Sequence, residues 1–164
     1  MSREVAQAAA DISARLKAAK LSLVTAESCT GGLIAAAITE IPGSSDVLER
    51  GYVTYSNVAK ENNLGVPADI IERHGAVSEQ TARAMAEGAL VHSEAAVSVA
   101  VTGIAGPDGG TPEKPVGLVH FAASRRGGPT IHKEIRFGDP GRGEVRRRSV
   151  LAAFALLNEL LDRA

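Results

Sequence analysis

The chain has 164 residues, of which 45% are hydrophobic and 3% aromatic, and its formal net charge is −1 at pH 7. That length allows one domain with a substantial buried core, so we expect a single domain over residues 1–164. A near-neutral chain with few aromatic side chains is a poor candidate for nucleic-acid binding, which draws on basic surfaces and stacking aromatics.

The single cysteine, Cys29, excludes an internal disulfide and a zinc site built from cysteines. It is compatible with a reducing compartment. The charged N-terminal segment lacks the apolar core of a signal peptide, and no segment reaches the roughly 20 apolar residues that cross a membrane. We therefore expect a cytoplasmic protein that does not contact a membrane.

Hydrophobic periodicity predicts alternating helices and strands. The first elements are a helix over about 3–19, a strand over 21–25, a helix from the Ser28–Gly32 turn to about 40, and a strand over 50–55. Helical segments at 56–64, 67–74 and 78–90, strands at 95–101, 118–124 and 130–137, and a helix from about 144 to the C-terminus follow. The hairpin signal at 125–129 makes the last two strands antiparallel. The sequence thus predicts a three-layer α/β/α fold with a mixed sheet of about five strands.

The polar turn Ser28–Gly32 is a candidate anion site. Unpaired N–H groups at a helix start attract phosphate or carboxylate, and the hydroxyls of Ser28 and Thr30 add donors. An ordinary helix cap is an equally good interpretation. Glu27 either caps the helix or orients a substrate amide or ribose hydroxyl, and Cys29 is either a nucleophile or a half-buried small residue.

Ser45 and Lys60 form a candidate catalytic pair. A serine hydroxyl needs a base, and a lysine serves when burial or a helix N-terminus lowers its pKa. Lys60 falls in the first turn of its predicted helix, and Tyr55 at the end of the preceding strand can relay a proton or hold Ser45. The alternative places Ser45 in a simple turn and Lys60 on the surface.

A glycine-rich loop, Thr102–Gly110 closed by Lys114–Gly117, follows the most apolar predicted strand. Ligands of open α/β sheets bind beyond the carboxyl ends of such strands, so the loop's N–H groups can form an oxyanion hole or hold a ribose. The loop lacks the G-x-G-x-x-G order of a dinucleotide site and the lysine–serine pair of a Walker motif. A connecting loop without further role is the alternative.

Four arginines, at positions 142, 146, 147 and 148, crowd the start of the last predicted helix. Cations there oppose the helix dipole, so a compensating anion such as a nucleotide phosphate is expected, with a solvated basic face as the alternative. The histidines at positions 74, 92, 120 and 132 have no metal-ligand spacing, and no metal is predicted.

Taken together, these motifs resemble the C-terminal domain family of CinA, the competence/damage-inducible protein. Within that family the chain is most similar to the stand-alone nicotinamide-nucleotide amidohydrolases, also called nicotinamide mononucleotide deamidases. The resemblance spans about Leu21 to Leu161. The motifs that carry it are Thr25–Gly32, Pro42–Ser45, Val53–Asn57 with Ala59–Lys60, His74–Ser78, and Thr102–Gly110 with Lys114–Gly117.

The resemblance implies a CinA-like, anticodon-binding-domain-like α/β/α fold and a homodimer. It implies hydrolysis of the carboxamide of nicotinamide mononucleotide to nicotinate mononucleotide and ammonia, in pyridine-nucleotide recycling. The family's serine–lysine arrangement falls on Ser45 and Lys60, with Tyr55 beside them. No metal or organic cofactor is implied.

We therefore expect a small-molecule pyridine nucleotide as the partner and neither nucleic acid nor membrane. The expected catalytic residues are Ser45, Lys60 and Tyr55, and the expected substrate-binding residues are Glu27, Ser28, Thr30, Gly31, Gly32, Thr102, Gly103, Gly106, Arg146 and Arg147. Two alternatives are a non-catalytic nucleotide-binding or competence-associated module, and a nucleic-acid binder that uses Arg142–Arg148.

Overall fold

The computed structural model describes residues 1–163, in which helices and strands are joined by turns and loops. The helices are α1 (Arg3–Ala19), α2 (Leu33–Thr39), α3 (Asn57–Leu64), α4 (Ala68–His74), α5 (Glu79–Val91) and α6 (Arg142–Asp162), with one short 3₁₀ helix, η1 (Ser44–Asp46). The strands are β1 (Leu23–Glu27), β2 (Leu48–Val53), β3 (Val97–Gly103), β4 (Leu118–Arg125) and β5 (Thr130–Arg136). Each matches a predicted element except η1, where the sequence indicated only a turn.

The strands form one mixed sheet in the order β2-β1-β3-β4-β5. β1 pairs in parallel with β2 and β3, whereas β4 pairs antiparallel with β3 and β5. The predicted mixed sheet of five strands is therefore confirmed. The predicted hairpin is confirmed as well, since the turn between Arg125 and Thr130 joins β4 directly to β5.

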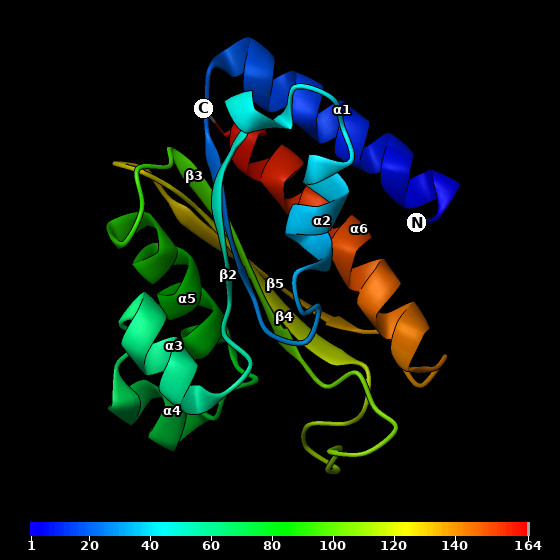
Figure 1. Ribbon diagram of the computed structural model, residues 1–164. Coiled ribbons are helices and arrows are strands. Elements are labelled where there is room, and N and C mark those ends of the chain that lie inside the picture. Colours follow the sequence, from blue (N-terminus) through cyan, green and yellow to red (C-terminus); the bar gives the residue numbers. More distant parts are fainter. Residues whose placement is uncertain (164) are drawn as a thin grey trace.

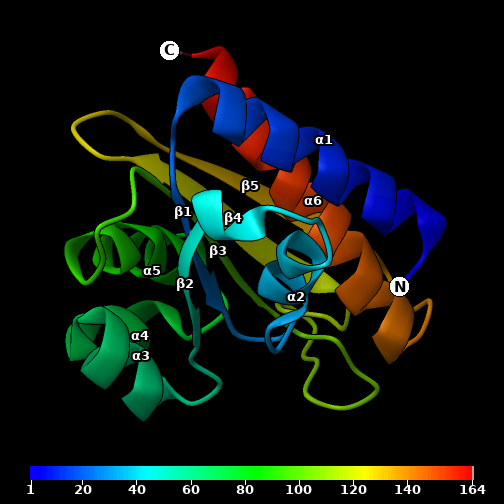
Figure 2. The same cartoon turned by 45° about the horizontal axis from the view of Figure 1, so that its top comes forward.

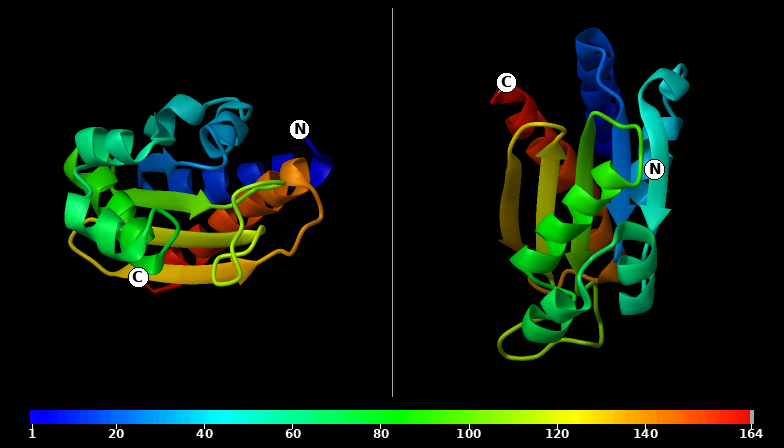
Figure 3. Two further views of the ribbon diagram at one scale, coloured as in Figure 1. Left: turned by 90° about the horizontal axis from the view of Figure 1, so that it is seen from below. Right: turned by 90° about the vertical axis from the view of Figure 1, so that its left-hand side faces the viewer.

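Helices cover both faces of the sheet, which gives the predicted three layers (Figure 1). α1, α2 and α6 lie on one face and α3, α4 and α5 on the other, as the turned views also show (Figures 2 and 3). Each face has its own cluster of buried apolar side chains. Gly88 permits a close approach of α5 to α3, because a Cβ at this position would stand 1.9 Å from the carbonyl oxygen of Leu64. Over residues 1–163, every helix is too short or too polar to cross a membrane.

Several strand boundaries differ from the predictions by one or two residues, and β2 runs over Leu48–Val53 instead of 50–55. β1 starts at Leu23 and continues through Glu27, two residues beyond the predicted end at Thr25. Backbone pairing explains the extension, because Glu27 stands opposite Val53 of β2 and Val101 of β3. β3 likewise runs on to Gly103, two residues beyond the predicted end. Pairing with neighbours therefore carries polar residues into the sheet that local composition assigns to loops.

The carboxyl ends of β1, β2 and β3 meet at one edge of the sheet, because these three strands run parallel. Three segments leave the sheet there: the Ser28–Gly32 turn, residues 54–56 and the loop 104–117. This edge is at the bottom of Figure 1, where the yellow-green loop and the start of α6 also lie. In open α/β sheets this edge is where ligands bind.

Two histidines link β4 to β5 on the face covered by α5. His120 Nδ1 and His132 Nε2 are 2.9 Å apart, so one ring must donate a proton and the other accept it. Their outer nitrogens lie 3.6 Å from a Glu134 carboxylate oxygen and 3.7 Å from one of Glu79. Burial is the main cause that lowers the pKa of both imidazoles.

Stability is therefore expected to fall as the pH drops below about 6.5. The unfolded chain's histidines take up protons near that pH, whereas the buried pair takes them up only at lower pH, so acid favours unfolding. Urea denaturation at pH 7.5 and pH 5.5 measures the loss. A variant with both His120→Gln and His132→Gln should lose less between the two pH values, and an undiminished loss would contradict the assignment.

Candidate active site

A cavity of about 270 Å³ lies at the carboxyl edge of the parallel strands. Its walls come from the end of β1, the β2–α3 connection, the α4–α5 turn, the loop after β3 and the start of α6. The lining residues are Ser28, Cys29, Tyr55, Lys60, Ala76, Val77, Thr102, Gly103, Ile104, Ala105, Gly106, Asp108, Gly109 and Arg142. Hydroxyl, amine, guanidinium and carboxylate groups thus converge on one concave site, which is the usual arrangement of an active site.

A lysine–serine contact lies within this cavity. Lys60 Nζ is 3.0 Å from Ser28 Oγ and 2.8 Å from the carbonyl oxygen of Thr54. The lysine is only 1% exposed and the serine 8% exposed. No carboxylate pairs with this amine anywhere in residues 1–163. Lys60 is therefore not a surface charge, and a buried lysine with neutral partners is suited to act as a general base.

Local sequence explains how Lys60 reaches the cavity. Ser56 caps α3 by accepting the N–H of Ala59, and Gly65 ends the helix in a left-handed conformation, both as predicted. These caps fix α3 so that Lys60, one turn in, points back toward the end of β1. Desolvation by burial lowers the pKa of Lys60. The positive end of the α3 dipole acts in the same direction.

Cys29 also lines the cavity but is not set up as a nucleophile. Its side chain is 5% exposed. Burial raises the pKa of the thiol to about 12, so the reactive thiolate is scarce at neutral pH. Of the two interpretations of Cys29, the structure favours the small buried residue.

The predicted contact between Ser45 and Lys60 is wrong, because the structure does not bring these two residues together. Ser45 lies in η1, before β2 begins, whereas Lys60 lies in α3, after β2 ends. The intervening strand, with six residues, separates the two by roughly 20 Å. Figure 1 shows the cyan η1 near the top of the molecule and α3 near the bottom. The hydroxyl that Lys60 contacts is that of Ser28.

Glu27 is a helix cap rather than a substrate ligand, which corrects the prediction of substrate binding. Its side chain is fully buried. One carboxylate oxygen accepts the Thr30 hydroxyl at 2.6 Å and the N–H of Ile34 at 2.9 Å, and the other accepts the N–H of Ala35 at 3.0 Å. A carboxylate at this position satisfies unpaired donors and complements the dipole of α2.

Five further predicted ligands do not line this cavity: Thr30, Gly31, Gly32, Arg146 and Arg147. Thr30 is fully buried, and its hydroxyl is bonded to Glu27. Gly31 and Gly32, with φ of +61° and +103°, shape the turn but do not line the cavity. Arg146 donates to the carbonyl oxygens of Cys29 and Thr30 and so stabilises the turn. Arg147 pairs with Glu4 and Glu144.

The structure does place the other predicted residues at the cavity: Ser28, Tyr55, Lys60, Thr102, Gly103 and Gly106. It adds Arg142 and Asp108, which the predicted site left out. Arg142 donates to the Gly106 carbonyl oxygen at 2.7 Å and to the Tyr55 hydroxyl at 2.8 Å. The sequence signal for Arg142 is its position at the start of the last helix. It could not be distinguished there from the three arginines that follow it.

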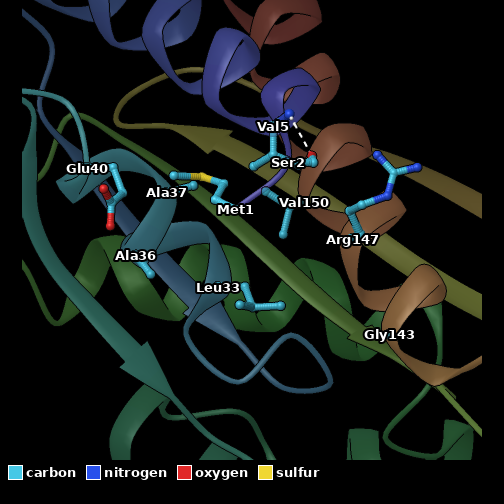
Figure 4. A pocket seen from close by; sticks show the side chains of 10 residues that line it. All are labelled: Met1, Ser2, Val5, Leu33, Ala36, Ala37, Glu40, Gly143, Arg147 and Val150. Atoms are coloured by element: carbon cyan, nitrogen blue, oxygen red, sulfur yellow. Dashed lines mark hydrogen bonds between the residues drawn. The ribbon is translucent and has the colours of Figure 1, made fainter.

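A second cavity, of about 250 Å³, lies between α1, α2 and α6 (Figure 4). Its walls are largely apolar, with Met1, Val5, Leu33 and Val150 among them. The Ser2 hydroxyl there accepts the N–H of Val5 and caps α1. This cavity offers no pairing of a nucleophile with a base, so the chemistry is assigned to the carboxyl edge of the sheet.

Fold and cavity together define the class: a three-layer α/β protein with a polar cavity where its parallel strands end. Within that class, the chain belongs to the CinA C-terminal domain family, whose model matches residues 5–161.

Relatives and solved structures agree with this assignment. A CinA-like protein of Akkermansia muciniphila is 62% identical over 110 residues, which are 67% of this chain and 27% of that protein. A CinA-like protein of Mycolicibacterium vanbaalenii is 52% identical over 85% of this chain and 33% of its own length. The chain thus spans about a third of the length of the curated relatives it matches.

The crystal structure of a competence/damage-inducible protein from Agrobacterium tumefaciens superposes with a TM-score of 0.95 at 51% identity. The match covers 98% of this chain and 97% of that one. A CinA superfamily protein from Escherichia coli gives a TM-score of 0.90 at 36% identity, over 95% and 90% of the two chains. These similarities establish the family and the fold.

Proposed function

We propose that this chain is an amidohydrolase that converts nicotinamide mononucleotide to nicotinate mononucleotide and ammonia. The observation that carries the proposal is the contact between the buried amine of Lys60 and the hydroxyl of Ser28 inside a cavity of about 270 Å³. The resemblance of the cavity motifs to nicotinamide-nucleotide amidohydrolases supplies the substrate class. Ser28 replaces Ser45 as the nucleophile in this proposal.

The neutral form of Lys60 suits the role of general base. In the structure the amine donates to the Thr54 carbonyl oxygen and to Ser28 Oγ. In the neutral amine the nitrogen lone pair accepts the Ser28 hydroxyl proton instead, while an N–H still donates to Thr54. As this proton moves to Lys60, Ser28 Oγ attacks the carboxamide carbon. The tetrahedral intermediate collapses with transfer of a proton to the departing nitrogen, which releases ammonia and leaves an ester on Ser28. Water activated by the same amine then hydrolyses the ester.

Backbone and side-chain groups around the pair have defined roles in the proposal. The N–H of Cys29 has no protein acceptor among residues 1–163 and adjoins Ser28, so it is the candidate donor to the oxyanion. Arg142, held by Tyr55 and by Gly106, replaces Arg146 and Arg147 as the candidate partner of the substrate phosphate.

The rate of ammonia release is expected to rise with pH and reach half its maximum below 10.5, the ordinary pKa of a lysine side chain. Burial lowers the pKa of Lys60, so deprotonation supplies the active base at a pH lower than a solvated lysine would allow. The dependence of kcat/KM on pH measures this. A profile without an ionisation in this direction would contradict the role of Lys60.

The direct test compares ammonia release from nicotinamide mononucleotide by the wild type, Lys60→Met and Lys17→Met. Methionine has nearly the shape of the lysine stem, so the fold should persist while activity falls by at least about 1,000-fold. Lys17 is an exposed lysine on α1 and serves as the matched control. If the wild type releases no ammonia while the nucleotide still raises the melting temperature, the chain is a nucleotide-binding module and the proposal fails.

A further inference from the structure

Two opposite charges face the mouth of the active-site cavity without pairing with each other. Apart from Lys60, the charged residues that line the cavity are Asp108 and Arg142. Arg142 donates only to neutral groups, a carbonyl oxygen and a tyrosine hydroxyl. Asp108 is exposed, and its carboxylate makes no hydrogen bond or ion pair with any other residue of the range 1–163. The cavity therefore presents one cationic and one anionic group that remain available to a ligand.

The position of Asp108 is fixed by the loop that carries it. Arg142 holds the Gly106 carbonyl oxygen, two residues before Asp108, at 2.7 Å. Val116 packs against Gly106, where a Cβ would stand only 2.6 Å from it. The loop is thus tied to α6 and to its own returning segment. The carboxylate of Asp108 is therefore carried by an anchored loop at the mouth of the cavity.

We infer that Asp108 is a specificity-determining residue that selects substrates with a positively charged pyridinium ring. This inference rests on the proposed function. In that reaction the carboxamide lies at Ser28 and the phosphate at Arg142, so the ring and its quaternary nitrogen occupy the space between them. A carboxylate facing this space attracts an oxidised pyridine nucleotide and gives no such attraction to the neutral dihydropyridine form.

The test measures binding rather than turnover, because the two ring forms also differ in the reactivity of their carboxamides. Calorimetry is carried out with full-length Ser28→Ala protein, alone and combined with Asp108→Asn, using oxidised and reduced nicotinamide mononucleotide. We expect Ser28→Ala to bind the oxidised form more tightly, and Asp108→Asn to reduce this preference by about fivefold, as for a partly exposed charge pair. The affinity for the reduced form should change by less than about twofold.

Glu113→Gln is the matched control, since Glu113 is an exposed carboxylate of the same loop that does not line the cavity. It should leave the preference unchanged. Equal weakening of both ligands by Asp108→Asn, or no change, would overturn the inference. So would the same loss from Glu113→Gln, because a general field effect would then be responsible. If the charge preference appears but the wild type releases no ammonia, the inference stands and the proposed hydrolysis fails.

Discussion

Replacing Ser28 with alanine should lower kcat for ammonia release from nicotinamide mononucleotide by at least about 1,000-fold, because loss of a nucleophile removes the covalent route. Replacing Ser45 should change kcat by less than about twofold. The reason is position: Ser28 Oγ lies 3.0 Å from the Lys60 amine, whereas Ser45 is exposed in η1 at the other end of β2.

Steady-state ammonia assays of Ser28→Ala and Ser45→Ala make this comparison directly, with each variant serving as the other's control. Thermal melting of both proteins shows whether either change disturbs the fold. A mass increase on Ser28 after rapid acid quenching would identify the ester. The opposite pattern, with an inactive Ser45→Ala and an active Ser28→Ala, would show that the contact seen here is not the catalytic one.

Replacing Glu27 with alanine should lower the free energy of unfolding by about 3 kcal/mol or more. The carboxylate is fully buried and accepts three hydrogen bonds, from Thr30, Ile34 and Ala35. Its removal leaves these donors without partners at the start of α2, and each buried unsatisfied donor costs about 1–3 kcal/mol. The Ser28 turn would loosen at the same time, so activity should fall with stability.

Urea denaturation at pH 7.5 measures the effect. Glu40→Ala is the matched control, because Glu40 is an exposed glutamate at the other end of α2 and its loss should cost less than about 0.5 kcal/mol. Glu27→Gln should fall between the two, since one amide oxygen can still accept hydrogen bonds. A loss below about 1 kcal/mol for Glu27→Ala would show that α2 starts without this carboxylate.

Local signals were sufficient for most of the fold. The Ser56 and Ser78 caps and the Gly65 helix end were predictable because each depends on hydrogen bonds within a few residues. The hairpin after Arg125 follows from turn chemistry in the same way. Strand ends were less predictable: the extension of β1 through Glu27 depends on β2 and β3 pairing with it from both sides.

The sequence predicts several individual residues of the site, but not which serine contacts the lysine. The sequence indicates both Lys60 and the Ser28 turn, but it pairs Lys60 with Ser45, a serine nearer in the chain. Sequence separation misleads here, because Ser28 and Lys60 follow neighbouring parallel strands and so share one edge of the sheet. The sequence does not show which arginine lines the cavity, Arg142 or Arg146. The two lie one helical turn apart, and only the fold decides which groups each contacts.

The sequence alone determined the helices, the strands, the mixed sheet and the short list of reactive residues, since periodicity, caps and turns act over a few residues. Tertiary structure decided which of those residues meet. It also lowered the pKa of Lys60, because burial depends on what distant segments place around the amine. The Glu27 side chain points inward and caps α2 for the same reason. Strand register and helix packing set its direction, not its neighbours in the chain.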